Sequence, residues 1–335
     1  MNSVRPLRPL PHRRMLIASL AGLGCALAWP QAQAQDWPGA RPVTLVVGTP
    51  AGGSVDVYAR ALAAQLATLT GGNFVVENKP GANGNISADA VLKAPADGHT
   101  LWVTTQAMFT INPSAYASLP WKQADFVPIA KGIESPLVLV TNPSVPAHTL
   151  PELRTWIAGH KDRAAYASFS PGTPSHFLGW QLNERMKLDM VHVPFKGSAP
   201  QLAAILGNQV SLGFTQLQAA IPQVQAHKLN ALAVTSAQRS KYLPQVPTLA
   251  ELGYKDLTMS IWFGLAAPAG TPKPALDALT AATVKAQADA GYRQKLEALG
   301  FDVPQESGAA FAATIADDTA RWARVVKATG FQANQ

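Results

Sequence analysis

The chain is poor in cysteine, with Cys25 as the single cysteine among 335 residues. Because Cys25 lies in an N-terminal segment that we expect to be removed, the rest of the chain has no thiol for a disulfide, a nucleophile or a metal site. Charged residues make up only 14% of the chain. Four of the 27 basic residues precede residue 35, which leaves 23 basic against 20 acidic residues. With no basic cluster interleaved with aromatics after residue 35, nucleic-acid binding is not expected.

Signatures of catalysis and of nucleotide binding are also missing. The sequence has no G-x-x-x-x-G-K-[ST], no G-x-S-x-G, and no G-x-G-x-x-G after its first expected strand. The histidines that follow the N-terminal segment include no pair at the H-x-x-x-H spacing typical of zinc sites. We therefore expect no enzyme, no metal site and no cofactor.

Residues 1–34 have the composition of an export signal. Basic residues extend to Arg14, an apolar stretch covers Met15–Trp29, and Ala32-Gln33-Ala34 fits an A-x-A cleavage site. The pair Arg13-Arg14 leaves twin-arginine export open, and Cys25 leaves a lipid anchor as a minor alternative. We predict a periplasmic protein, cleaved after Ala34, with no membrane insertion once the signal is removed.

Short apolar runs alternate with helical patterns from Arg41 onward. The first series predicts strands at 43–47, 73–78 and 99–105 and helices at 56–69 and 86–94. The second predicts strands at 137–142, 164–170, 190–195, 210–216 and 231–236, with helices at 149–160, 176–186 and 201–209. A strand at 261–270 returns to the first series, and helices at 274–299 and 307–329 follow. This order predicts parallel sheets with helices on their faces, and ligands beyond the carboxyl ends of the strands.

The late return of the chain predicts two α/β lobes. Residues 35–136 and 261–335 form lobe 1, and residues 137–260 form lobe 2, with boundaries near Leu137 and Ser260. Two chain crossings between the lobes make a hinge.

Three turns between a strand and a helix share a composition of Gly, Ser, Thr and Pro, at 48–54, 168–175 and 195–200. A helix N-terminus presents free N–H groups and a partial positive charge, and glycine lets a ligand approach the backbone. One such turn is more often structural, because every βα unit needs a turn. Three of them, divided between two lobes, favour an anion site, and the missing phosphate-loop signatures favour a carboxylate.

Several residues near these turns allow two interpretations. Lys196 either faces the ligand or is a solvated turn residue, and Asp56 either contacts the ligand or complements the helix dipole. Trp262 either walls the cleft, which we favour, or packs in the core. His192, in an apolar strand, is more typical of a core residue. Trp102, Trp121, Trp156 and Trp180 are expected to serve packing.

Six segments, taken together and in order, resemble one known family. They are "NKPGANGNISADAVLKAPADGHTL" (78–101), "INPSAY" (111–116), "YASFSPGTPSHF" (166–177), "VHVPFKGSAPQLAAILGNQV" (191–210), "LNALAVTSAQRSKYLPQVPTLAELGY" (229–254) and "WFGLAAPAGTP" (262–272). The chain is similar in these segments to the exported solute-binding receptors of tripartite tricarboxylate transporters, the Bug receptor family. The resemblance implies a type II periplasmic-binding-protein fold, with two α/β lobes joined by a two-crossing hinge around a central cleft. It also implies capture of a small carboxylated solute for the membrane subunits of a transporter.

The resemblance also implies which residues contact the ligand, largely through backbone groups and ordered waters. In lobe 1 they are Thr49, Ala51, Gly52, Gly53, Ser54, Asp56, Thr105 and Gln106. In lobe 2 they are Ser168, Ser170, Thr173, Ser175, Lys196, Gly197 and Ser198. Thr215, Gln216 and Trp262 complete the expected site.

The sequence departs from the family pattern at two places. The first loop, which usually reads like PFPPGGGTD, is "GTPAGGSVD" (48–56), so the cleft wall loses an aromatic ring. Thr215 and Gln216 stand where the family commonly has Asp-Asn, which removes a carboxylate that would attract a ligand ammonium group. We therefore predict a di- or tricarboxylate or an aromatic acid, rather than an amino acid, as the ligand of a monomeric receptor.

Two other functions remain open. A sensor module that docks on a signalling protein needs the same ligand clamp. An exported hydrolase using Ser175 or Ser54 is less favoured, because the sequence offers no oriented base for either serine: Ser175 and His176 are adjacent and badly placed for one another.

Overall fold

A computed structural model describes Met1 and residues 37–333, so the predicted export signal and its cleavage site lie outside the described residues. The apolar, β-branched run Val43–Val47 forms β1, which pairs in parallel with β2 (Phe74–Asn78) and β3 (Thr100–Thr105). Helices α2 (Ser54–Thr70) and α3 (Asn85–Lys93) connect these strands. The predicted βαβαβ unit is confirmed, and its three strands end at Val47, Asn78 and Thr105.

Two antiparallel strands extend this sheet. β9 (Ser260–Pro268) pairs with β3, and β4 (Phe126–Thr141) pairs with β9 and with the short β10 (Glu306–Ser307). β4 is 16 residues long and continues into the second sheet. The predicted strand at 137–142 covered only the last five residues of β4. The earlier part was missed because Pro128, Lys131 and Glu134 interrupt its apolar pattern.

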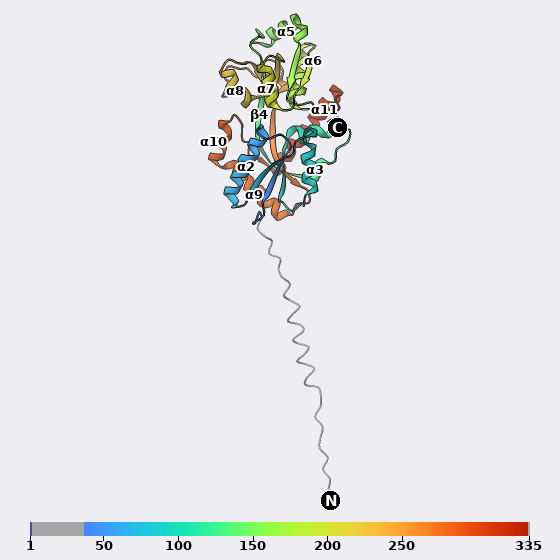
Figure 1. Cartoon of the computed structure of the whole chain (residues 1–335), viewed down its shortest axis with the longest axis vertical. Coiled ribbons are helices and arrows are strands. Elements are labelled where there is room, and N and C mark those ends of the chain that lie inside the picture. Colours follow the sequence, from blue (N-terminus) through green and yellow to red (C-terminus); the bar gives the residue numbers. More distant parts are fainter. Residues whose placement is uncertain (2–36, 334–335) are drawn as a thin grey trace. The chain divides into compact units, whose positions relative to one another are not determined.

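The second half of β4 pairs with β7 (Leu212–Gln216) and β8 (Asn230–Val234), and β7 pairs with β5 (Ala165–Ser168) and β5 with β6 (Val191–Pro194). This sheet is accompanied by α5 (Leu150–Gly159), α6 (Pro174–Met186), α7 (Ser198–Leu206) and α8 (Leu217–Gln225). Figure 1 shows α5 to α8 around the second sheet, α2, α3 and α9 around the first, and β4 between them. The mixed α/β architecture, with two sheets that share β4, agrees with the predicted fold of two α/β lobes.

The C-terminal region differs from the prediction in one respect. The single helix predicted at 274–299 is wrong, because α9 (Lys273–Ala288) and α10 (Ala290–Ala298) are separated at Asp289. Asp289 is extended, and its carboxylate accepts the Tyr292 N–H at 2.7 Å as the cap of α10. The helix α8, with Pro222 inside it, was not predicted.

The last helix, α11 (Gly308–Thr329), packs against β4 and, through Trp322, against α6. It follows β10, which pairs with β4 in the first sheet. Farther along, the Trp322 ring packs on Phe177 of α6 at a centroid distance of 5.8 Å, and Phe331 packs edge-on against His176 at 5.2 Å. The end of the chain therefore supports the N-terminal part of α6.

Aromatic side chains fill the first lobe beside α3. Trp102 is fully buried and packs on Phe126 and Phe109 at centroid distances of 4.7 and 5.5 Å. Trp121 and Trp156 are also buried, which confirms their predicted packing role, whereas Trp180 is half-buried. The predicted cap of α5 is confirmed too, since Thr149 and Glu152 form a reciprocal capping box.

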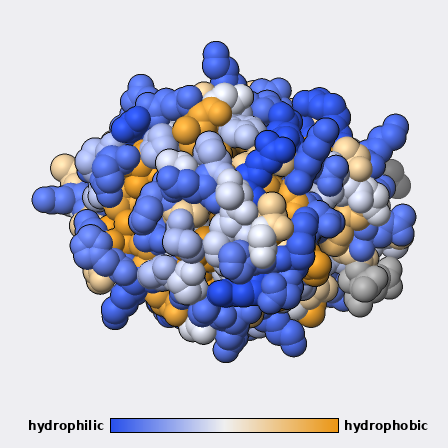
Figure 2. Space-filling model, turned by 90° about the horizontal axis from the view of Figure 1, so that it is seen from above, coloured by the Kyte–Doolittle hydropathy of each residue, from blue (hydrophilic) through white to orange (hydrophobic). Residues whose placement is uncertain are grey.

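The surface offers small, separate apolar areas. Figure 2 shows a mainly hydrophilic face with scattered apolar residues. The exposed large apolar side chains, such as Val191 and Ile86, belong to different elements. Within the described part of the chain, every helix is too short or too polar to cross a membrane.

Candidate functional site

The first strand–helix loop presents the uncapped N-terminus of α2. The first helical hydrogen bond of α2 joins Val57 N–H to the Gly53 carbonyl at 3.0 Å. The N–H groups of Ser54, Val55 and Asp56 precede it and therefore have no helical acceptor. Gly53 caps the helix without a side-chain hydrogen bond. This end of α2 thus offers donors and a partial positive charge to an anion.

The two predicted turns of lobe 2 have the same construction and lie side by side. The first helical bonds join Phe177 N–H to Thr173 O in α6 and Gln201 N–H to Gly197 O in α7. Neither helix has a side-chain cap. Two backbone bonds, Phe195 N–H to Ser168 O at 2.9 Å and Gly197 N–H to Phe169 O at 2.8 Å, join the turns. Since α3, α8, α9 and α11 also lack side-chain caps, the convergence of these turns, rather than the missing caps, marks the site.

The loops of the two lobes meet directly. The Ser54 hydroxyl of α2 donates to Gln216 Oε1, at the end of β7, at 2.6 Å. Gln218 Nε2 donates to Ser54 Oγ at 2.7 Å and to Gln216 Oε1 at 2.8 Å. The structure therefore brings together predicted residues that are 162 positions apart. Gln218 was not predicted, and its place on an unexpected helix explains why.

The predicted hydroxyls of lobe 2 shape their own loop. Ser168 and Thr173 both donate to the Ser170 carbonyl, at 3.1 and 2.6 Å, and Ser175 accepts the Phe169 N–H at 3.1 Å. All three hydroxyl-bearing residues are buried. Because these side chains hold the loop together, the backbone N–H groups at the start of α6 are the groups left to meet a ligand.

Asp56 lies in the first turn of α2, where it complements the helix dipole, and it also bonds to three neighbouring groups. It is 3% exposed, and its Oδ2 accepts Gly52 N–H and Arg60 Nε at 3.0 and 2.9 Å, while Asn78 Nδ2 reaches Oδ1 at 3.0 Å. Burial raises the pKa of Asp56, but these three donors outweigh it and the pKa is lowered. The carboxylate is therefore committed to holding the first loop.

A stack of histidines lies behind the second-lobe loop. The rings of His176 and His192 are parallel within 13° at 3.8 Å, and His192 also stacks on Tyr166. His176 Nδ1 accepts the Gly172 N–H at 3.2 Å, and His192 Nε2 lies 2.6 Å from Ser168 Oγ. Burial lowers the pKa of His176 to about 3, helped by the charge of His192, and that of His192 to about 4. Both rings are neutral supports of the loop near neutral pH. His192 is stacked and hydrogen-bonded but half-buried, rather than the core residue that was predicted.

The other predicted residues have varied surroundings. Thr49 Oγ1, Gln106 Oε1 and Thr215 Oγ1 are buried atoms with no hydrogen-bond partner among the described residues. Thr105 Oγ1 accepts the Met108 N–H at 3.2 Å. Lys196 is exposed, as are Ala51 and Gly52, whereas Gly53, Gly197 and Ser198 are half-buried. Buried polar atoms normally find a partner, so the first three atoms suit a site that takes a polar ligand or water.

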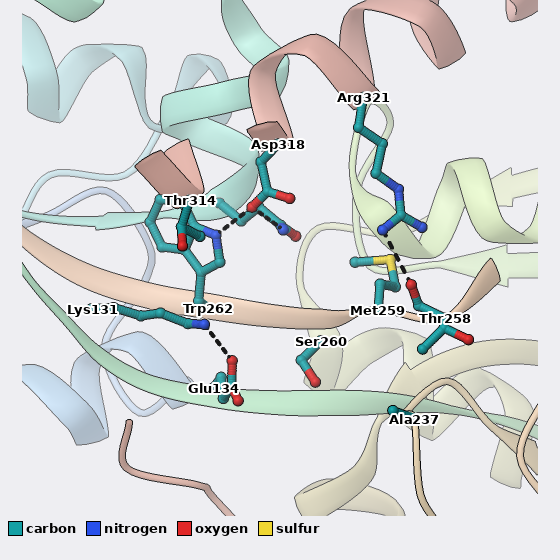
Figure 3. Close-up of a pocket in the computed structure, with 11 residues that line it drawn as sticks. Lys131, Glu134, Ala237, Thr258, Met259, Ser260, Trp262, Thr314, Asp318 and Arg321 are labelled. Atoms are coloured by element: carbon teal, nitrogen blue, oxygen red, sulfur yellow. Dashed lines mark hydrogen bonds and ion pairs between the residues drawn. The ribbon is translucent and has the colours of Figure 1, made fainter. Parts of the chain in front are cut away.

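A cavity of about 290 Å³ lies between α11 and the strands β4 and β9, which connect the two lobes (Figure 3). Gln106 and Trp262 are the two predicted residues among its 11 lining residues. Trp262 is 1% exposed, and its Nε1 donates to Asp318 Oδ2 at 2.7 Å, as does Gln106 Nε2 at the same distance. Trp262 thus lines this cavity and packs edge-on against Phe311 at a ring-centroid distance of 5.0 Å.

The charged side chains around this cavity all bond to neighbouring protein groups. Lys131 Nζ lies 2.6 Å from Glu134 and 3.3 Å from Glu306. Burial lowers the pKa of Lys131, but both carboxylates more than offset this, and the pKa is raised. Arg321 donates to the Thr258 and Asp256 carbonyls, each at 3.1 Å. These interactions suit a support for the hinge better than an anion site. No group of three metal-ligating side chains occurs among the described residues.

Comparison with known proteins gives a family match over most of the chain. Residues 58–331 match the model of the tripartite tricarboxylate transporter family receptor. Protein BugT of Bordetella pertussis is 36% identical over 307 residues, covering 87% of this chain and 90% of BugT.

Two solved structures are similar throughout. An R. palustris protein, Rpa4515, solved with adipate, has a TM-score of 0.81 and 31% identity, covering 89% of this chain and 99% of that protein. MatC from Rhodopseudomonas palustris, solved with bound malate, has a TM-score of 0.78 and 32% identity, covering 85% of this chain and 99% of MatC.

Proposed function

The chain belongs to the tripartite tricarboxylate transporter receptor family, whose members are solute-binding proteins rather than enzymes, and we propose that it binds a small carboxylate without a cationic group. The ligand is a di- or tricarboxylate or an aromatic acid. It lies between lobe 1 (35–136 and 261–335) and lobe 2 (137–260). After release, the membrane subunits of a transporter take it up.

The observation that carries this proposal is that backbone bonds join the uncapped starts of α6 and α7, while the uncapped start of α2 in the other lobe bonds to the end of β7. The starts of α2, α6 and α7 supply N–H donors, and the Ser54–Gln216 bond at 2.6 Å ties the first loop to lobe 2. Backbone donors bind a carboxylate without needing a basic side chain.

The predicted site residues include no carboxylate that is free to pair with a ligand ammonium group, which supports a ligand without an amine. Asp56, the one carboxylate in the predicted set, is already neutralised by Arg60 and braced by Asn78. The neutral pair Thr215 and Gln216 stands at the end of β7. A ligand ammonium group would therefore lose water without gaining an ion pair. The bound adipate and malate of the two similar structures agree with this ligand class.

A thermal-shift screen of the exported protein tests the proposal. The panel holds dicarboxylates, tricarboxylates, aromatic acids, amino acids and phosphate esters. A ligand at 100 times its Kd adds about 2.7 kcal/mol of stability, which raises the Tm by roughly 5–10 °C. We expect this rise from one class of amine-free carboxylate. A rise only with phosphate esters or amino acids would contradict the proposal.

A pair of charge variants makes the screen specific to the α2 N-terminus. Gly53→Asp fits sterically, because Gly53 has φ −78° and an added Cβ meets only Pro50 O, at 3.6 Å. Its carboxylate occupies the free donors and repels an anion, so the ligand-induced shift is lost while the fold keeps its Tm. The control, Ala290→Asp, adds the same charge to the first turn of α10, and there the shift is retained.

A further inference from the structure

The contact between the lobes is a closed ring of hydrogen bonds. Ser54 Oγ donates to Gln216 Oε1 at 2.6 Å, and Gln218 Nε2 donates both to Ser54 Oγ at 2.7 Å and to Gln216 Oε1 at 2.8 Å. Ser135 Oγ, on the hinge strand β4, donates to Gln218 Oε1 at 3.1 Å. We call these four residues, Ser54, Ser135, Gln216 and Gln218, the interlobe clasp.

Gln218 is the residue that joins all parts of the clasp. Its amide touches lobe 1 through Ser54, lobe 2 through Gln216 and the crossing strand through Ser135. Its backbone also lies close to Gly300, since a Cβ on Gly300 would lie 3.2 Å from Gln218 Cα. Gly300 has a φ of 84°, which suits glycine, and so allows this close approach.

The surroundings make these bonds effective. Gln216 and Ser135 are 6% and 1% exposed, and Ser54 and Gln218 are half-buried. Water therefore competes poorly for the buried groups of Gln216 and Ser135. All four groups are neutral, so the clasp forms without burying a charge.

We propose that Gln218 is a positioning residue, which holds the lobes together through the interlobe clasp before any ligand binds. A ligand that contacts both lobes then meets a site that is already assembled, and the closed fraction of the free protein scales its affinity. The effect on ligand affinity rests on the proposed function of the protein as a two-lobe receptor. The clasp itself does not depend on which ligand binds.

The ring distinguishes two isosteric substitutions. Gln216 takes part only as an acceptor, through Oε1, so Gln216→Glu keeps both incoming donors. Gln218 takes part as a double donor, through Nε2, so Gln218→Glu loses both bonds and turns a carboxylate oxygen toward Gln216 Oε1. Both variants add one negative charge at the N-terminus of α8, where acidic residues are favourable. Any difference between them therefore comes from the donors rather than from the charge.

The test measures lobe separation in the ligand-free full chain. Nitroxide labels are placed on Ala64→Cys in α2 and Ala158→Cys in α5, both exposed positions, in a Cys25→Ser background with no other cysteine. Pulsed electron–electron double resonance then gives the distribution of distances between the two labels. Gln218→Glu should lower the ratio of the short to the long distance population about tenfold, whereas Gln216→Glu should match the parent protein.

Several outcomes would overturn the proposal. They are unchanged distances in Gln218→Glu, equal opening in both glutamate variants, and opening in Gln216→Glu alone. If Gln218→Glu fails to fold, Ser54→Ala removes the same ring from lobe 1, and it should open the lobes as well. No ligand enters this experiment, so a mistaken ligand class leaves its result unaffected, and the thermal-shift screen tests that class separately.

Discussion

The stacked pair His176 and His192 makes the stability of the protein depend on pH in a defined direction. His176 is 8% exposed, its Nδ1 accepts the Gly172 N–H, and its ring lies 3.8 Å from that of His192. Protonation would bury a charge, remove the acceptor for Gly172 and oppose any charge on His192. Burial, followed by the charge of His192, lowers the pKa of His176 from 6.5 to about 3.

The sign follows from the lowered pKa. As the pH falls below about 6.5, the unfolded chain takes up the proton while the folded chain does not, so the folded state loses stability. The loss continues until the pH reaches the folded pKa of about 3. A pH of 5 lies about 1.5 units below the pKa of a histidine in the unfolded chain. His176 therefore lowers the free energy of unfolding at pH 5 by about 2 kcal/mol relative to pH 8. This lowers the Tm by roughly 4–6 °C.

Urea unfolding at pH 8 and pH 5 measures this effect, and His176→Asn isolates it. The Asn amide oxygen can still accept the Gly172 N–H, but it does not titrate. The difference in unfolding free energy between the two pH values should therefore shrink by about 2 kcal/mol in the variant. His227→Asn serves as the control, because His227 lies on an exposed turn at a φ of 56°, which Asn tolerates. Equal pH dependence in the parent protein and His176→Asn would refute the reasoning.

Three further substitutions test other parts of the account. Ser175→Ala leaves the Phe169 N–H without its acceptor and should cost about 1–3 kcal/mol in urea unfolding, whereas a neutral result would mean that this hydroxyl does not hold the loop. Asp56→Asn removes charge-assisted bonds and should cost a similar ~1–3 kcal/mol at pH 7 in urea unfolding. This penalty should fade as the pH drops below about 4, because the lowered pKa of Asp56 stabilises the fold fully only above the pKa of an aspartate in the unfolded chain. Gly132→Ala would place a Cβ 1.8 Å from Tyr58 Oη in the core, so we expect a loss of about 1–3 kcal/mol, and calorimetry showing an unchanged Tm would contradict the packing described.

Periodicity predicted the regular elements of the fold well where apolar residues alternate cleanly with polar turns. The strand at 43–47 and the capping box at Thr149 are found as expected. Patterns mixed with charge or proline were missed, as in the first half of β4 and in α8 with Pro222. The break at Asp289 was missed because Ala288 and Ala290, which flank it, favour helix, although Asp289 and Gly291 do not.

The site was predictable as a set of turns but not as a set of contacts. Gly, Ser and Thr between strand and helix indicated the helix N-termini correctly. The sequence could not show that Ser168 and Ser175 bond within their own loop, because those partners depend on the loop conformation. Nor could it show Gln218, whose partners come from residues far away in sequence. The predicted ligand contacts as a whole stay predictions.

The most direct test of the account is a calorimetric titration with matched pairs of acids. Malate and aspartate differ at one carbon, which carries a hydroxyl or an ammonium group, and adipate and 2-aminoadipate differ in the same way by an added ammonium group. A cleft of neutral donors without an available carboxylate should bind the amine-free acid of the better pair at least tenfold more tightly, or about 1.4 kcal/mol. Tighter binding of the amino acid in both pairs would contradict the central claim.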